Sequence, residues 1–213
     1  MKTDELIDNL SKTLAPVSPR TVAMRLAEGV LAGALVSFVL MWAWLGIRPD
    51  LMGAMATSAY WMKFFYTLLL AALAYWATER LARPGGVARL AMSGAAIVFA
   101  ILFAMAAMQL MRAAPDARMP LVMGHSSHVC PWRIIALSLP VFAGTFWSLS
   151  RLAPTRLVTA GIVAGVASGA LGAWIYAFHC DESAAPFVLV FYTLSIAVIG
   201  AAGAFAAGRF LRW

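Results

Sequence analysis

Charged residues are scarce in this chain: only 12% of its 213 residues are Asp, Glu, Lys or Arg, whereas 63% are hydrophobic. Ordinary soluble domains carry about 25% charged residues, so this composition excludes that class. Histidine and cysteine are scarcer still, with three and two copies. Two cysteines far apart in the sequence cannot build a disulfide-rich scaffold, although they could pair once in an oxidising compartment.

Sequence motifs of catalysis are also absent. The chain has no Cys-x-x-Cys pair, no serine nucleophile motif, no phosphate-binding loop and no His-Glu-x-x-His motif. Membrane thiol oxidoreductases generally need a Cys-x-x-Cys pair beside a quinone. We therefore expect no enzymatic activity, and keep a membrane thiol oxidoreductase or a small transporter as the alternative functions.

Long apolar runs recur along the chain, each long enough for the roughly 20 helical residues that cross a bilayer. Two of these runs carry small residues four positions apart, which favours close helix packing; these are Gly29 and Gly33, and Gly161, Gly165 and Gly169. The predicted fold is therefore all-α: a polytopic membrane protein, with a six-transmembrane-helix bundle after a short amphipathic cytoplasmic N-terminal helix. The expected membrane helices are approximately 27–45, 60–78, 90–111, 134–149, 157–178 and 187–208.

Lysine and arginine predict the orientation. With the N-terminus inside, eleven of the 16 lie on inner segments and five on outer ones, which is a positive-inside bias. We therefore expect both termini in the cytoplasm, and we attribute the net charge of +7 to topology rather than to direct nucleic-acid binding. Glu28 and Lys63 lie nearest the membrane interior, and we expect their side chains to reach the interface.

Residues 1–25 read as a cytoplasmic tail, separate from a membrane sensor domain at residues 26–213. Apolar residues in the tail recur at helical spacing and form one narrow stripe. A helix of about three turns is marginal alone in water, so the stripe needs a surface to cover it. A groove on a protein partner and the inner leaflet are the two alternatives, and the acidic neighbours disfavour anionic lipid. The predicted partner-binding residues are Asp4, Glu5, Leu6, Ile7, Asp8, Leu10 and Leu14.

Two short polar stretches, Gly124–Trp132 and His179–Ser183, interrupt the apolar sequence and hold every histidine and cysteine. The predicted topology puts both in outer loops. Cys130 and Cys180 are the candidate sensing thiols, as a reversible disulfide or a metal-responsive pair. A permanent disulfide and two unrelated cysteines are the other possibilities, since reduction potential cannot be read from sequence.

The same stretches could hold a transition metal such as zinc, because Cys, His and carboxylates are its protein ligands. The spacing does not match a standard zinc finger, and polar loop histidines bonded to the backbone are the competing interpretation. No cofactor is certain. The candidate ligands are His125, His128, Cys130, His179, Cys180, Asp181 and Glu182.

Several short segments together resemble a known family. They are Thr3–Leu10, Gly124-His125 to Cys130–Arg133, Leu139-Pro140, Ala153–Thr155, Tyr176–Cys180 with Glu182, Phe187, Tyr192-Thr193 and Leu211–Trp213. With these residues the chain is similar over essentially its full length to the NrsF family, negative regulators of the extracytoplasmic-function sigma-F factor in proteobacteria.

This resemblance implies an anti-sigma factor in the bacterial inner membrane, with six helices in the lipid bilayer. It also implies that the cytoplasmic N-terminus holds the sigma factor and that the outer cysteines take part in a response to metal or oxidative stress.

Overall fold

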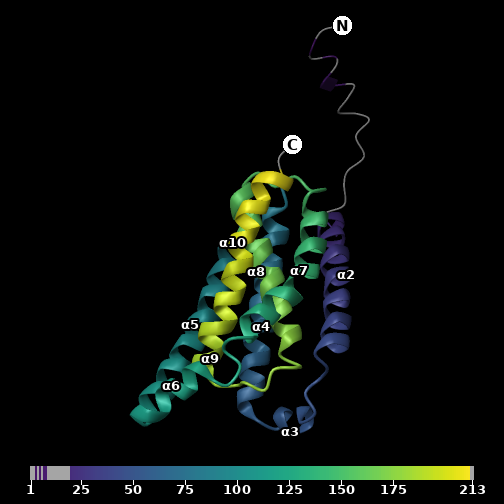
Figure 1. The fold of residues 1–213 in the computed structure, drawn as a ribbon. Coiled ribbons are helices and arrows are strands. Elements are labelled where there is room, and N and C mark those ends of the chain that lie inside the picture. The colour runs from purple at the N-terminus through teal and green to yellow at the C-terminus, as the bar shows by residue number, and fades with distance from the viewer. Residues whose placement is uncertain (1–2, 4, 6, 9–19, 212–213) are drawn as a thin grey trace.

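The computed structural model describes residues 3, 5, 7, 8 and 20–211, and these residues form helices and connecting loops without strands (Figure 1). The predicted all-α class is confirmed. The elements are α2 (Arg20–Trp44), α3 (Leu51–Met55), α4 (Ser58–Leu81), α5 (Arg89–Arg112), α6 (Pro115–Met123), α7 (Cys130–Leu149), α8 (Leu157–Tyr176), α9 (Ala185–Phe187), the π-helix η1 (Val188–Tyr192) and α10 (Thr193–Phe210).

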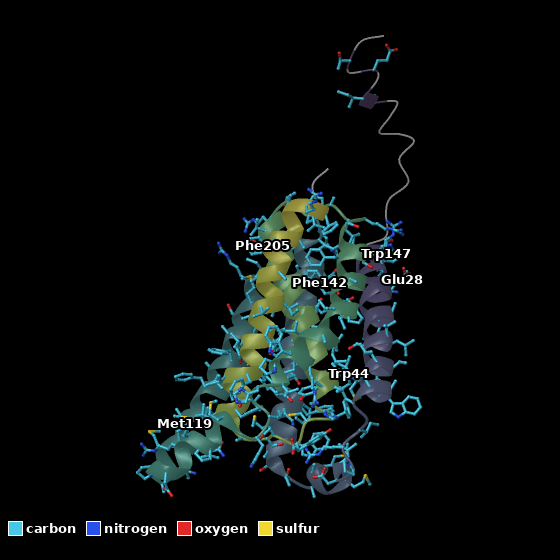
Figure 2. All side chains as sticks on the ribbon, viewed as in Figure 1. Glu28, Trp44, Met119, Phe142, Trp147 and Phe205 are labelled. Carbon is cyan, nitrogen blue, oxygen red and sulfur yellow. The ribbon has the colours of Figure 1, made fainter. Side chains whose placement is uncertain are left out.

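Five helices of the described chain are long and apolar enough to span a membrane: α2, α5, α7, α8 and the continuous helix formed by α9, η1 and α10. Helix α4 is of similar length, at 24 residues, but Lys63 and three tyrosines dilute its apolar character. The exposed surface is rich in large apolar side chains. Trp44 on α2 and Phe205 on α10 project away from the bundle (Figure 2), with 56% and 83% of their surface exposed.

Glycine seams bring helix backbones into direct contact, as the spacing of small residues predicts. A Cβ atom on Gly33 would lie 2.5 Å from the carbonyl oxygen of Pro140 in α7. Gly165 of α8 meets the backbone of α10 in the same way, at Ile199 and Gly200. Helix α8 is consequently the most enclosed of the candidate spans, with 67% of its most apolar window buried.

The two ends of the bundle differ in character. Helix α2 begins and α10 ends at one end, whereas α3, α6 and the two polar stretches lie at the other (Figure 1). At the first end, two hydrogen bonds fix the start of α2: Tyr75 Oη donates to Ala23 O at 3.0 Å, and Ser148 Oγ donates to Arg25 O at 2.8 Å. The start of α2 is therefore attached to both α4 and α7.

The structure differs from the predicted helices in three places. Helix α7 begins at Cys130 rather than at residue 134, because Pro131 needs no intrahelical partner in a first turn and its fixed φ suits that position. The short helices α3 and α6 occupy segments expected to be loops. The last long helix contains a π-helical turn at Val188–Tyr192, and the spacing of apolar residues in the sequence does not indicate it.

Candidate functional site

The two polar stretches adjoin at one end of the bundle, and Glu182 joins them. Its carboxylate accepts hydrogen bonds from the backbone N–H of His125 and of Ser126, the latter at 3.3 Å. Gly124 makes this approach possible: its φ is +54°, and a Cβ atom there would lie 2.5 Å from Glu182 Oε1. Both the backbone angle and the close contact favour glycine at this position. Glu182, a predicted metal ligand, thus accepts hydrogen bonds from backbone amides and holds the two polar stretches together.

Cys130 and Cys180 lie against one another. Cys130 is the first residue of α7, and Cys180 lies in the loop after α8; both are free thiols, with 0% and 2% of their surface exposed. The two thiol groups are in hydrogen-bonding contact. They are part of a core cluster that also contains Tyr176, Phe187 and Tyr192. The site is therefore a buried pair of thiols in largely apolar surroundings.

Two cations from other segments fix the loop that carries Cys180. The ammonium of Lys63, on α4, donates to the carbonyl oxygens of Cys180 and Glu182 at 2.7 and 2.6 Å, and Lys63 is fully buried. Arg48 also donates to the Cys180 carbonyl, at 3.2 Å, while forming a two-point ion pair with Asp50 at 2.7 Å. The expectation that Lys63 reaches the water interface is wrong, because its ammonium is instead enclosed by protein carbonyls.

The π-helix supplies a further wall of the site. A π-helical turn has i→i+5 bonding, and such turns are frequent at functional sites. Here it ends at Tyr192, which is fully buried, with its hydroxyl group toward Cys180 and its ring centroid 6.2 Å from that of Tyr176. The Lys63 ammonium lies 6.0 Å from the centre of the Tyr192 ring. The sequence-based prediction named Lys63 but assigned it to the interface, and it gave Arg48 and Tyr192 no part in the site. The lone lysine in an apolar helix was the available signal.

The surroundings favour the thiolate form of Cys180. The hydrogen bond from the Cys130 thiol and the positive charge of Lys63 lower the pKa of Cys180 to about 6, against the opposing effect of burial. A thiolate is the form that attacks disulfides and oxidants and that binds metals. Two adjacent thiols, one of them ionised, can form a disulfide with a two-electron oxidant or bind a thiophilic metal through both sulfurs.

The three histidines have different surroundings. His179 Nδ1 lies 2.9 Å from Gly46 O, and its Nε2 lies 3.2 Å from Arg133 Nη1. These partners match a neutral ring that donates from Nδ1 and accepts at Nε2. The side chain of His125 is fully exposed, with Nδ1 3.7 Å from Glu182 Oε1, and His128 is exposed too. His179 therefore ties its loop to neighbouring segments, which was the competing interpretation of the loop histidines.

The predicted ligands do not form one cluster. Within the part of the chain that the structure describes, no three His, Cys, Asp or Glu side chains gather as a metal site would require. The reason is local. His179 contacts the Gly46 carbonyl and Arg133, the Glu182 carboxylate accepts hydrogen bonds from backbone N–H groups, and Asp181 is exposed. The cysteine pair alone stays available as two sulfur ligands, and a metal there stays a prediction.

The tail predictions fall mostly beyond the described residues. Asp4, Leu6, Leu10 and Leu14 lie outside them. Glu5, Ile7 and Asp8 are described as helical and exposed, with 59% of the Ile7 surface accessible. Partner binding by this stripe stays a prediction.

The chain was compared with protein families, with curated proteins and with solved structures. The family model described as NrsF, negative regulator of sigma F, matches residues 10–213. The chain is 37% identical to the anti-sigma-F factor NrsF of Caulobacter vibrioides and 36% identical to the probable anti-sigma-F factor NrsF of Azospira oryzae. Both alignments cover the whole of each chain. No solved structure matches. The chain therefore belongs to the NrsF family, the negative regulators of sigma F.

Proposed function

We propose that this chain is an inner-membrane anti-sigma factor that captures an extracytoplasmic-function sigma factor with its cytoplasmic tail and releases it when the outer thiol pair reacts. The observation that carries the proposal is the full-length similarity to two proteins named as anti-sigma-F factors. The adjacency of Cys130 and Cys180 supports the second half, because these are the only two cysteines and they come from distant segments.

Six membrane spans are part of this proposal, with α4 as the sixth. Its 24 residues suffice to cross a bilayer, and enclosure of Lys63 by protein carbonyls removes the main objection to that depth. An even number of spans agrees with α2 beginning and α10 ending at the same end of the bundle (Figure 1). The arginine-rich turns Glu79–Arg89 and Arg151–Arg156 would then face the cytoplasm.

Helix α7 is the proposed link between the two faces. Cys130 is the first residue of α7, and Ser148 lies near its last residue. The Ser148 hydroxyl donates a hydrogen bond to the backbone carbonyl of Arg25, at the start of α2. Gly29 and Gly33 hold α2 directly against α7 over the intervening length. A shift of α7 on thiol reaction would therefore move the root of the tail. A 100-fold loss of sigma affinity needs about 2.7 kcal/mol of coupling, within the range that a disulfide supplies.

Co-purification tests the capture step. The tagged full-length protein is isolated from its own host in nanodiscs, and bound proteins are identified by mass spectrometry. We expect an extracytoplasmic-function sigma factor, and expect its loss in the Leu6→Ala/Leu10→Ala double variant while membrane insertion is unchanged. Absence of any sigma factor from the wild-type eluate would overturn the proposed function, and retention by the double variant would exclude the tail as the binding element.

Oxidant treatment of the purified complex tests the release step. Diamide should release the sigma factor from the wild-type protein, whereas Cys130→Ser and Cys180→Ser should each hold it. His125→Gln, a change in an exposed neighbour, should behave as wild type. Release from both cysteine variants would exclude the thiol pair. A parallel sample treated with zinc chloride separates the two chemistries, because release by zinc alone supports a bound metal rather than a disulfide.

A further inference from the structure

A groove runs along the outside of the bundle between α4 and α5, separate from the thiol pair. It consists of two adjoining cavities of about 300 and 470 Å³ that share Ser58, Met62 and Met105. Volumes of this size are typical of small-ligand pockets. The inner cavity is lined almost wholly by apolar side chains, among them Trp61, Phe65, Leu69, Val98, Ile101 and Leu102.

The outer cavity has a different lining. Methionine side chains continue the apolar wall with Met108, but Gln109, Arg112 and Ser183 add polar groups at the end nearest the polar stretches. Gln109 is held in place there, because its Oε1 accepts a hydrogen bond from the backbone N–H of Ala185 at 2.9 Å. The groove therefore changes along its length from apolar to polar and cationic.

Among the described residues that line these two cavities, Arg112 alone is charged. Its side chain is exposed at the last residue of α5, and no acidic side chain pairs with it in the part of the chain that the structure describes. An occupant should therefore combine a long apolar part with an anionic group at one end.

A second copy of the chain fits this groove poorly. A symmetric dimer in a membrane has its two-fold axis along the membrane normal, so both copies place a given residue at the same depth. An interface centred on α4 and α5 would bring Arg112 toward Arg112 of the other copy, and like charges so placed repel. Helix α5 nevertheless has only 17% of its most apolar window buried, so lipid must cover what protein does not.

We infer that the α4–α5 groove is a binding site for an anionic phospholipid, with an acyl chain along the inner cavity and the phosphate at Arg112. The membrane placement comes from the proposed function, but the lipid site does not depend on sigma-factor binding. Ser183 and Ala185 line the outer cavity directly after Glu182, so a bound headgroup would contact the segment that follows the Cys180 loop.

Trp61 offers a direct readout because it lines the inner cavity and is 38% exposed. The full-length protein is placed in nanodiscs with lipids brominated on one acyl chain, since a bromine atom in contact with a tryptophan quenches its fluorescence. Subtracting the signal of Trp61→Phe isolates this residue from the other seven tryptophans. Brominated phosphatidylglycerol and brominated phosphatidylcholine are compared at equal amounts.

We expect the quenching of Trp61 to report about a five-fold preference for phosphatidylglycerol, the value of one basic residue near a membrane surface. The preference should vanish in Arg112→Gln and persist in Arg112→Lys. Arg118→Gln is the matched control, because Arg118 lies outside both cavities and donates to Ala113 O. The control should keep the wild-type preference.

Three results would overturn the inference. Equal quenching by the two lipids in the wild-type protein means that only unselective lipid surrounds α5. A preference for phosphatidylglycerol that survives Arg112→Gln shows that Arg112 does not bind the headgroup. Loss of quenching by both lipids, together with two copies of the chain per nanodisc, means that another copy covers the groove. Sigma-factor capture plays no part in these readings, so failure here leaves the proposed function standing.

Discussion

Helices α8 and α5 are opposite cases of a membrane-length helix in one bundle. The most apolar window of α8 is 67% buried and that of α5 only 17% buried. On α8, glycines meet the backbone of α10 directly, whereas Gly94 of α5 faces only the flexible side chain of Leu73. The thiol site belongs to the closely packed side through α7, and the lipid groove belongs to the open side. Backbone-to-backbone helix contact and an exposed apolar helix surface therefore occur within the same bundle.

The largest effect should come from adding one methyl group at a seam. In Gly165→Ala the new Cβ would press on the backbone of Ile199, which cannot move aside, so we expect a loss of about 3 kcal/mol of stability, the upper end of what overpacking usually costs. In the matched variant Gly94→Ala the nearest atom is Leu73 Cδ2 at 3.1 Å, and that side chain can rotate. Thermal unfolding in detergent compares the two. Equal destabilisation would erase the distinction between the two sides.

Removing the buried cation should have the next largest effect. Lys63→Met leaves the Glu182 carbonyl without its side-chain donor and leaves the Cys180 carbonyl with Arg48 alone, and an unsatisfied buried carbonyl costs about 1–3 kcal/mol. We expect lower thermal stability and faster hydrogen exchange at the backbone amides of the loop that carries Cys180, a readout that does not depend on ionisation of the thiol. Arg118→Met, on the open side, changes an exposed residue and should shift stability by less than about 0.5 kcal/mol. Unchanged hydrogen exchange in this loop of Lys63→Met would contradict the role of Lys63 in fixing the loop.

A smaller and local effect is expected at the joint between the two polar stretches. Glu182→Ala removes the acceptor for the backbone N–H groups of His125 and Ser126, at a cost of about 1–2 kcal/mol. Hydrogen exchange at these two amides should accelerate, while exchange in α8 stays as in the wild type. Glu182→Gln retains an acceptor oxygen and should exchange at an intermediate rate. Unchanged exchange at both amides in Glu182→Ala would show that the loop geometry is held by other contacts.

The last effect is the most local one, because it concerns the ionisation of a single thiol group. The pKa of Cys180 is lowered from 9.0 to about 6, so its ionisation stabilises the folded protein fully above pH 9.0. That contribution decreases as the pH falls and is lost as the pH passes through about 6. Ultraviolet absorbance of the thiolate should follow this change in the wild-type protein and be missing in Cys180→Ser. A thiolate signal that first rises near pH 9 would contradict the proximity of Lys63 and Cys130.

Much of the fold could be predicted because apolar runs and glycine spacing are local signals. The expected helix at residues 60–78 corresponds to α4 at Ser58–Leu81, and Gly165 meets α10 closely, as its spacing indicates. The site was harder to predict, since it depends on contacts between distant segments. The sequence places Cys130 and Cys180 on one face, but it does not reveal that Lys63 binds the loop carbonyls or that His179 is engaged by Gly46. Those roles depend on helix rotation and loop path rather than on composition.

The π-helical turn at Val188–Tyr192 also bears on how this chain could change in length. A π-helical turn accommodates one residue more than an α-helical turn between the same flanking segments. Deleting a single residue within it would convert the segment to continuous α-helix without rotating α10 against α8. The same deletion in the first turn of α10 would turn Gly200 and Gly203 away from their contacts on α8. Within the last long helix, the packing against α8 therefore accommodates a one-residue deletion at Val188–Tyr192. This segment ends at Tyr192, whose hydroxyl group faces Cys180.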